Sequence, residues 1–405
     1  MKNQKVLSID YFDKFQCVGS KCEDHCCKDW MITIDKKTYM KYKKLQASEF
    51  KNRLLSNVGR YRHSKSDYDY GKIRLVNNKC PMLSEDNLCE VYTNIGEENM
   101  CYTCREYPRF YNQVDDTVEA SLTLSCIEVA KNILLRENPI EFNFDIKEIE
   151  NINLNSTIIT SKSKKLKEKY FNEIRIFCIS LIQNRRFSIE ERLAILGLFI
   201  KNINETCDEQ YIIKIITEYG MNIENGTFDN ILKNINSEKN IEAQLEFLTK
   251  IYNVILYKDI KDQKFLKSFS SVVGNLKLDS NNSGTIKESF IESLNNYYNS
   301  FMKNYEYIYE NYLVNYMFIN LFPINNMSLL DTYINLIVNF SIIKMNLIGL
   351  CGHYKEDMDK EKVVHFIQSF AKVVEHDSFI VDKLHKYLSS NNLNTFAHMV
   401  ILMGK

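Results

Sequence analysis

The distribution of cysteine constrains this chain of 405 residues most: nine of its twelve cysteines lie within the first 126 positions. They are Cys17, Cys22, Cys26, Cys27, Cys80, Cys89, Cys101, Cys104 and Cys126. Thiolates are soft ligands, so this cluster points to iron–sulfur or zinc rather than to magnesium or calcium. The remaining Cys178, Cys207 and Cys351 lie far apart in helix-like surroundings. The sequence therefore places the chemistry of the protein in its first third.

The nine cysteines form four local groups, whose spacing is typical of ligands to a metal or a cluster. The groups are Cys17-x4-Cys22-x3-Cys26-Cys27, Cys80-x8-Cys89, Cys101-x2-Cys104 and the isolated Cys126. A close pair such as Cys101 and Cys104 can place two thiolates on one metal or cluster without backbone strain. Only one C-x-x-C pair is present, so the spacing leaves both zinc and iron open. A cluster needs four thiolates, so some of the nine are expected to be ligands of a second metal or buried structural residues.

Charge and hydropathy exclude several function classes. The 52 basic and 52 acidic residues cancel, so no overall field favours nucleic acid or an acidic membrane surface. The start of the chain has no apolar core of the kind a secretory signal needs. The apolar stretch Tyr333–Leu350 contains Asn335 and Lys344, which favours a buried helix over a membrane span. We therefore expect a cytoplasmic protein in which the thiols stay reduced and no disulfides form.

The distribution of proline and of apolar residues predicts a mainly α fold in two parts. Three of the four prolines lie in the first 140 residues, which indicates a loop-rich start. The spacing of Leu193, Leu196 and Ile200 fits one apolar helix face. We expect a cysteine-rich, metal-binding module with short strands over 1–136, a linker over 137–162, and an all-helical domain over 163–405.

Local patterns predict individual elements. WMITID, from Trp30 to Asp35, alternates like a strand, and Asp35 is placed to cap a helix that runs to about Leu55. Cys80–Tyr92 is typical of a hairpin that turns at residues 84–87, and a short helix is expected over Ile127–Arg136. The later helices are expected at Ser163–Leu181, Ile189–Ile203, Ile241–Leu256, Ile286–Leu321, Leu329–Leu350 and Lys360–Ser389.

The cysteines and their neighbours together resemble a known family. FQCVGSKCEDHCCKDWMITID, CPML…LCEVY, CYTCREYPRF and SLTLSC resemble the flagellin lysine N-methylase family. They are also similar to a wider group of cysteine-rich proteins that chelate zinc or iron. The resemblance covers residues 12–130, and the helical remainder is similar only in length and general character.

This resemblance implies transfer of a methyl group from S-adenosylmethionine to lysine side chains of flagellin, with a [4Fe–4S] cluster required. It implies that about four of the nine cysteines Cys17 to Cys126 ligate the cluster. The twelve glycines form no G-x-G-x-x-G turn, so the methyl donor is not expected to bind as in a Rossmann fold. Glu23, Asp24 and Glu106 stand next to ligand candidates and are the candidates for the base that deprotonates lysine.

Other interpretations remain open. The first part of the chain could be an iron–sulfur domain for electron transfer or redox sensing, or zinc could stabilise a binding module without transferase activity. Tyr61–Tyr70, with Asp67 and Asp69, could hold a lysine by cation–π contact and charge, or be an ordinary surface loop. In Gly349–His353 we expect glycine to end a helix, with metal ligation by Cys351 and His353 as the alternative.

Overall fold

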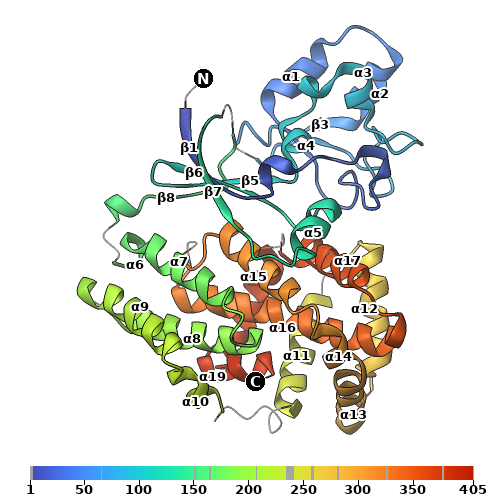
Figure 1. Cartoon of the computed structure of the whole chain (residues 1–405). Coiled ribbons are helices and arrows are strands. Elements are labelled where there is room, and N and C mark those ends of the chain that lie inside the picture. Colours follow the sequence, from blue (N-terminus) through green and yellow to red (C-terminus); the bar gives the residue numbers. More distant parts are fainter. Residues whose placement is uncertain are drawn as a thin grey trace.

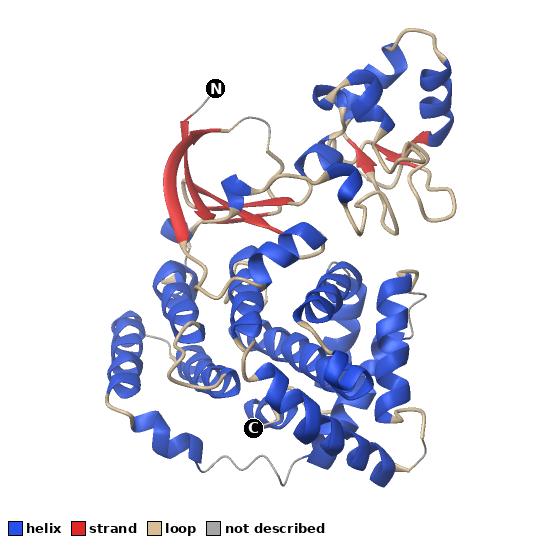
Figure 2. Cartoon of the chain, turned by 45° about the vertical axis from the view of Figure 1, so that its right-hand side comes forward, coloured by secondary structure: helices blue, strands red, loops and turns tan. Residues whose placement is uncertain are grey.

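Two separate hydrophobic cores organise the computed structural model of the protein. The larger core joins a five-stranded sheet to a body of helices. The smaller core belongs to residues 26–106, which we call the cysteine-rich lobe. The lobe and the sheet lie on the same side of the helical body in both views (Figure 1, Figure 2). The structure describes residues 3–64, 66–149, 152–163, 166–206, 208–233, 241–256, 260–280, 282–324, 327–375 and 378–404.

The lobe combines a small sheet, in the order β2-β4-β3, with four short helices. Its elements are β2 (Thr33–Ile34), α1 (Lys36–Lys44), α2 (Glu49–Asn57), β3 (Val58–Arg60), β4 (Gly71–Ile73), α3 (Glu90–Ile95) and α4 (Tyr102–Glu106). The predicted cap is confirmed, because the Asp35 carboxylate accepts a hydrogen bond from the N–H of Thr38. The helix does not run to Leu55, however, since it ends at Lys44 and Ser48 caps a second helix.

The predicted strand and the predicted hairpin of the lobe are both shorter than expected. Only Thr33 and Ile34 of the predicted Trp30–Asp35 strand pair with β4. The turn at 84–87 is present, with the N–H of Ser84 bonded to the carbonyl of Leu88. The hairpin is reduced to one bridge between Leu83 and Cys89, because α3 begins at Glu90.

The five-stranded sheet has the order β7-β1-β6-β5-β8. Its strands are β1 (Asn3–Ile9), β5 (Arg109–Val114), β6 (Thr117–Leu122), β7 (Phe142–Glu148) and β8 (Ser156–Ile158). β1 runs parallel to β6, β5 and β6 form a hairpin, and β7 and β8 pair with β1 and β5. The segment 137–162, expected as a linker, therefore supplies two strands, and both ends of the predicted cysteine-rich module contribute to this sheet.

The rest of the chain is helical, as the sequence predicted. The helices are α5 (Ile127–Leu134), α6 (Leu166–Lys169), α7 (Phe171–Ile182), α8 (Ile189–Glu205), α9 (Glu209–Glu224), α10 (Thr227–Lys233), α11 (Ile241–Leu256), α12 (Gln263–Leu276), α13 (Ser283–Ser293), α14 (Asn299–Met302), α15 (Tyr307–Ile319), α16 (Leu329–Tyr354), α17 (Lys360–Phe370), α18 (Ser378–Ser390) and α19 (Phe396–Met403). Two π-helical segments, η6 (Leu294–Tyr298) and η8 (Ala371–Glu375), continue α13 and α17. The stretches predicted at 163–181, 286–321 and 360–389 are therefore each divided.

Polar contacts fix the sheet on the helical body. The Asn112 side chain on β5 donates to the carbonyl of Ile319 on α15 at 2.8 Å. Glu119 on β6 forms two hydrogen bonds with the guanidinium of Arg175 on α7, and both side chains are at most 6% exposed. Because buried charges are tolerated only when paired, this ion pair fixes the position of the sheet relative to α7.

α16 is the buried helix that the sequence predicted. It is the one helix in the described part of the chain that is long and apolar enough to cross a membrane, and 94% of its most apolar window is buried inside the protein. The prediction that glycine ends it near Gly349 is wrong, because the helix continues to Tyr354. A Cβ on Gly349 would meet Val272 at 2.7 Å, so this glycine allows α12 to pack closely against α16.

Candidate functional site

Five of the nine N-terminal cysteines share the small core of the lobe. Cys80 and Cys101 are buried in it, and three further cysteines pack against it: Cys27, Cys89 and Cys104. Thiols therefore take the place of aliphatic side chains in much of this core, beside Ile34 and Tyr42. The lobe core is small, and these thiols supply part of it beside residues such as Leu54 and Ile73.

Two pairs of thiols are joined by hydrogen bonds within this region. In the Cys26–Cys27 pair, the hydrogen bond lowers the pKa of Cys26 and raises that of Cys27. In the Cys101–Cys104 pair, it lowers the pKa of Cys101 and raises that of Cys104. Each pair thus combines one sulfur that favours the thiolate with one that favours the thiol. These are the two closest groupings that the sequence identified.

Three of the cysteines stand immediately before helices. Cys89 precedes α3, Cys101 precedes α4 and Cys126 precedes α5. Burial raises the pKa of Cys126 to about 12, while the N–H groups of Glu128 and Val129 act in the opposite direction. Backbone N–H groups at a helix start favour a thiolate, and a bound metal would offset the cost of burial.

The remaining cysteines lie outside the small core. Cys22 and Cys126 pack against the large core, and Cys17 is exposed. Cys26 connects the two regions, because it lies within electrostatic range of Cys22, Cys80, Cys89, Cys104 and Cys126. Cys178 and Cys351 are buried in the helical body, and Cys207 lies outside the described residues.

The donor set fits a multi-iron cluster in its chemistry. A single tetrahedral zinc ion would bring its sulfurs to about 3.8 Å from one another, given a Zn–S bond near 2.3 Å. No three His, Cys, Asp or Glu side chains among the described residues form a group that could hold one metal ion. A [4Fe–4S] cluster takes one thiolate on each iron, so its ligands need not converge on a single point. The lobe core offers five soft thiols for that purpose.

The three candidate bases have different environments. Glu23 is half exposed, and a hydrogen bond from Lys131 at 2.7 Å lowers its pKa, which disfavours it as a base. Glu106 lies beside Arg105, with Nε at 3.1 Å. Asp24 is 8% exposed and accepts a hydrogen bond from Gln368 at 2.8 Å. Of the three, Asp24 alone has a buried side chain, at a contact between the cysteine run before the lobe and the helical body.

Sequence reasoning missed the residues that surround Asp24. Lys372 in η8 lies within ion-pair distance of Asp24, Asp29 and Asp262. Burial acts to lower the pKa of Lys372, but Asp24 and Asp262 outweigh it and raise that pKa. Nothing in the sequence connects positions so far apart, so only the fold could reveal this group.

A cavity of about 530 Å³ opens on the lobe beside α1 and α4. Its lining residues are Asp35, Lys36, Lys37, Thr38, Met40, Lys41, Asp67, Tyr68, Glu98, Tyr102 and Arg105. Asp67 and Tyr68 thus place part of the Tyr61–Tyr70 stretch at a cavity. Asp67 is already paired with Lys36 at 3.3 Å, however, so its charge is not free for a substrate.

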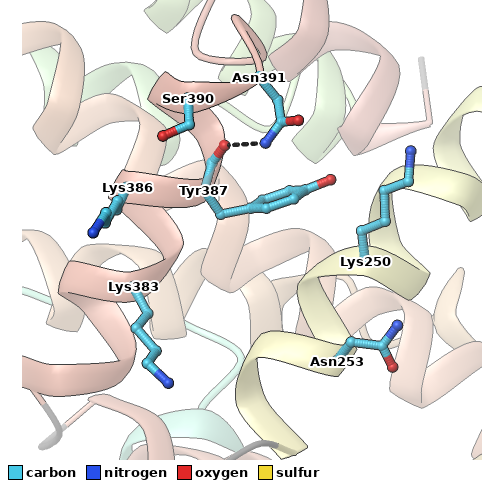
Figure 3. A pocket seen from close by; sticks show the side chains of 7 residues that line it. All are labelled: Lys250, Asn253, Lys383, Lys386, Tyr387, Ser390 and Asn391. Carbon is cyan, nitrogen blue, oxygen red and sulfur yellow. Dashed lines mark hydrogen bonds between the residues drawn. The ribbon is translucent and has the colours of Figure 1, made fainter.

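A second, shallow groove of about 500 Å³ lies between α11 and α18. Figure 3 shows three lysines around it, Lys250, Lys383 and Lys386, with Tyr387 between the two helices. Lys250 is paired with Glu246. The groove lies on the helical body, and none of the described residues that line it is an acid or a thiol.

Glu375, at the end of η8, is a carboxylate whose charge changes near neutral pH. Burial raises its pKa to about 7, although a hydrogen bond from the Tyr312 hydroxyl acts to lower it. π-Helical segments occur frequently at functional sites. The segment η8 therefore carries both Lys372 and a group with the pKa of an effective proton acceptor.

We expect the free energy of unfolding to fall as the pH rises from about 5 to about 8. The folded state holds the Glu375 proton up to about pH 7, whereas the unfolded state releases it near its ordinary pKa. Ionisation therefore costs the folded state about 3 kcal/mol across this window. Urea unfolding at several pH values measures this change in the free energy of unfolding. In Glu375→Gln, the free energy of unfolding should depend less on pH. An equal slope in wild type and variant would contradict the assignment.

The sequence of the helical body identifies the family. Residues 175–402 match the FliB lysine N-methylase C-terminal domain. The chain belongs to the FliB lysine N-methylase family. The match lies in the helical part, which the sequence analysis had related to the family only by length and general character.

The names of two similar proteins agree with this assignment. The chain is 32% identical over 202 residues to a lysine-N-methylase of Salmonella typhimurium, which is 49% of this chain and 48% of that protein. It is 36% identical over 136 residues to the flagellar biosynthetic protein FliU of Salmonella muenchen, covering 33% of this chain and 79% of that protein. The chain thus matches about half the length of the S. typhimurium lysine-N-methylase. No solved structure matches it.

Proposed function

We propose that this FliB-family protein transfers methyl groups from S-adenosylmethionine to lysine side chains of flagellin in the cytoplasm, and that a [4Fe–4S] cluster in the lobe is required. The observation that carries the proposal is the concentration of thiols in one small core, Cys27, Cys80, Cys89, Cys101 and Cys104, in a chain of this family. The balanced charge of the chain supports a protein substrate rather than nucleic acid.

The cluster ligands come from the lobe core and from Cys26. Cys26 and Cys101 favour the thiolate through hydrogen bonds from their partners, and thiolates are the ligands of iron–sulfur clusters. When bound, the cluster would supply iron sites that can coordinate the donor or exchange an electron. Cys22 and Cys126 pack against the large core and Cys17 is exposed, so the proposal assigns these three no place among the ligands.

The net reaction breaks the bond between the sulfonium sulfur and the methyl carbon and forms a bond between that carbon and lysine Nζ. The donor leaves as a neutral thioether, and the lysine ammonium releases one proton. Free lysine has a pKa of about 10.4, so the protein must accept that proton or desolvate the ammonium. Asp24 is the base candidate buried at the contact with the helical body, where it also lies 3.3 Å from the ammonium of Lys372.

A labelled-donor assay tests the activity. The anaerobically purified protein, incubated with flagellin and methyl-labelled S-adenosylmethionine, should place label on lysine and nowhere else. Flagellin with chemically blocked lysines is the matched control and should remain unlabelled. Label on other residue types, or no label with intact protein and substrate, would contradict the proposal.

Metal analysis of the same preparation separates the alternatives. Iron and acid-labile sulfide in equal amounts support the cluster. Zinc alone, with unfolding on chelation, indicates a zinc-stabilised binding module. Iron that is reversibly reduced, without binding of S-adenosylmethionine, indicates an electron-transfer or redox-sensing protein.

A further inference from the structure

The outer edge of the five-stranded sheet is open along the whole of β7. β7 is an end strand of this sheet, and each of its seven residues pairs with β1 on one side. Within the described part of the chain, no strand pairs with its other side. β7 contains no proline and its register with β1 is unbroken. It therefore lacks two of the devices that keep further strands from pairing with an exposed edge.

Hydrogen bonds show which backbone groups of β7 face the open edge. The N–H of Asp10 donates to the carbonyl of Glu141, so the backbone groups of the odd-numbered residues that follow also face β1, by alternation. Those of the even-numbered residues, such as Ile146, face outward. The N–H of Ile146 donates to the side chain of Asp145 at 2.8 Å. This carboxylate takes the place that a carbonyl of an added strand would fill.

Two large apolar side chains beside this edge are exposed. Phe142 packs against Phe318 of α15, with ring centroids 4.9 Å apart, and Phe144 and Ile146 follow on the same face of β7. Phe144 and Ile146 are 62% and 63% exposed. They have strand neighbours from β1 on one side, and on the open side none among the described strands. Aromatic and β-branched residues on neighbouring strands stabilise each other, so an added strand with apolar side chains would be stabilised here.

The charge along β7 selects the chemistry of the partner. Glu141, Asp145 and Glu148 are exposed, and none of them forms an ion pair with another described residue. The cation of this strand, Lys147, is already paired with Asp13. A second copy of this chain would bring the same acids to the edge, and like charges on paired strands are destabilising. The edge therefore fits a strand that carries lysine or arginine.

We propose that the open edge of β7 binds an extended protein segment in which apolar side chains alternate with lysine or arginine. The segment adds a sixth strand to the sheet, a recognised mode of peptide binding. One of its carbonyls accepts from the N–H of Ile146, which releases the Asp145 carboxylate to pair with a basic side chain. Its apolar side chains cover Phe144 and Ile146. In one respect the inference rests on the proposed function: if that holds, the segment belongs to flagellin.

The probe is a fluorescent peptide of alternating valine and lysine, as long as β7, whose binding to the full-length protein is followed by fluorescence anisotropy. Asp145→Lys should weaken binding by about tenfold, because it replaces an attraction by a repulsion. Glu85→Lys is the matched control, since it changes an exposed acid of the lobe by the same charge, and it should bind as wild type does. Phe144→Ser/Ile146→Ser should also weaken binding by about tenfold. Both side chains are exposed, so this variant should fold.

A modified peptide tests whether binding uses the backbone. The same peptide, N-methylated on two neighbouring central residues, keeps its charge and its apolar side chains but loses a central donor on each of its edges. It should bind at least about tenfold more weakly. Equal binding of the two peptides, or an equal loss in Asp145→Lys and Glu85→Lys, overturns the proposal. So does equally tight binding of a peptide of alternating valine and glutamate.

Two further measurements separate this inference from its neighbours. The peptide assay contains neither flagellin nor S-adenosylmethionine, so its outcome is independent of whether methyl transfer occurs. In the labelled-donor assay, Asp145→Lys should raise KM for flagellin by about tenfold and leave kcat unchanged. An unchanged KM would overturn docking at β7 and leave the proposed function standing. Light scattering tests the other occupant: a wild-type dimer that Phe144→Ser/Ile146→Ser abolishes, without peptide binding, would assign the edge to a second copy and overturn the proposal.

Discussion

Replacing Cys104 by alanine should remove most of the iron and lower the rate of methyl transfer by about 100-fold or more. Substituting a residue that only hydrogen-bonds to a metal ligand already lowers metal affinity or activity by about 10- to 100-fold. Cys104 packs against the core of the lobe and shares a hydrogen bond with Cys101. Its loss takes away one of the proposed ligands and the partner that favours the Cys101 thiolate. Iron and sulfide per chain, together with the initial rate of label transfer, measure the effect.

Cys178→Ala is the matched control for this substitution. Cys178 is a fully buried thiol in α7 of the helical body, where it packs in the larger core, whereas Cys104 is partly buried. This variant should keep the iron content of wild type and its transfer rate, apart from a modest loss of stability. Equal loss of iron in both variants would mean that general destabilisation, rather than ligation, explains the result for Cys104.

Glu119→Ala should lower the free energy of unfolding by about 3–5 kcal/mol, because it leaves the Arg175 guanidinium buried without its counter-charge. Glu119 and Arg175 are 2% and 6% exposed and connect β6 with α7. Urea unfolding followed by circular dichroism measures the change. The double variant Glu119→Leu/Arg175→Met should recover most of the loss, since apolar residues of similar size can replace a buried pair.

An exposed ion pair provides the comparison. Lys250 and Glu246 form a pair four residues apart on α11, where the two side chains are 47% and 68% exposed. Glu246→Ala should cost less than about 1 kcal/mol, as is usual for surface pairs. Similar costs for Glu119→Ala and Glu246→Ala would contradict the role assigned to the buried pair.

The parts of the fold that depend on local pattern could be predicted from the sequence. The apolar spacing predicted α8 and α11, and both predicted ends of α11 agree with the structure. The Asp35 cap was also predictable, because capping depends on neighbours within one turn. The strand β7 was missed although Phe142, Phe144 and Ile146 alternate with polar residues, since the polar composition of 137–162 suggested a linker.

The parts that depend on distant contacts could not be predicted. β1 pairs in parallel with β6, so Val6 lies beside Val118, and no local signal specifies such a pairing. For the same reason, cysteine spacing identified the thiol pairs but not their common core. Asp24 was identified as a candidate base from its neighbours in sequence. Its ion-pair partner Lys372, and Asp262, which faces the same lysine, lie more than 200 residues further along the chain.

Flagellin mass, measured after co-expression with this protein, tests the central claim most directly. We predict that flagellin made with the wild-type chain gains the mass of one or more methyl groups, and that peptide mapping places all of them on lysines. Flagellin made with Cys104→Ala should gain none or very few, and that made with Cys178→Ala should match wild type. Unmodified flagellin in the presence of folded, iron-loaded wild-type protein would contradict the claim.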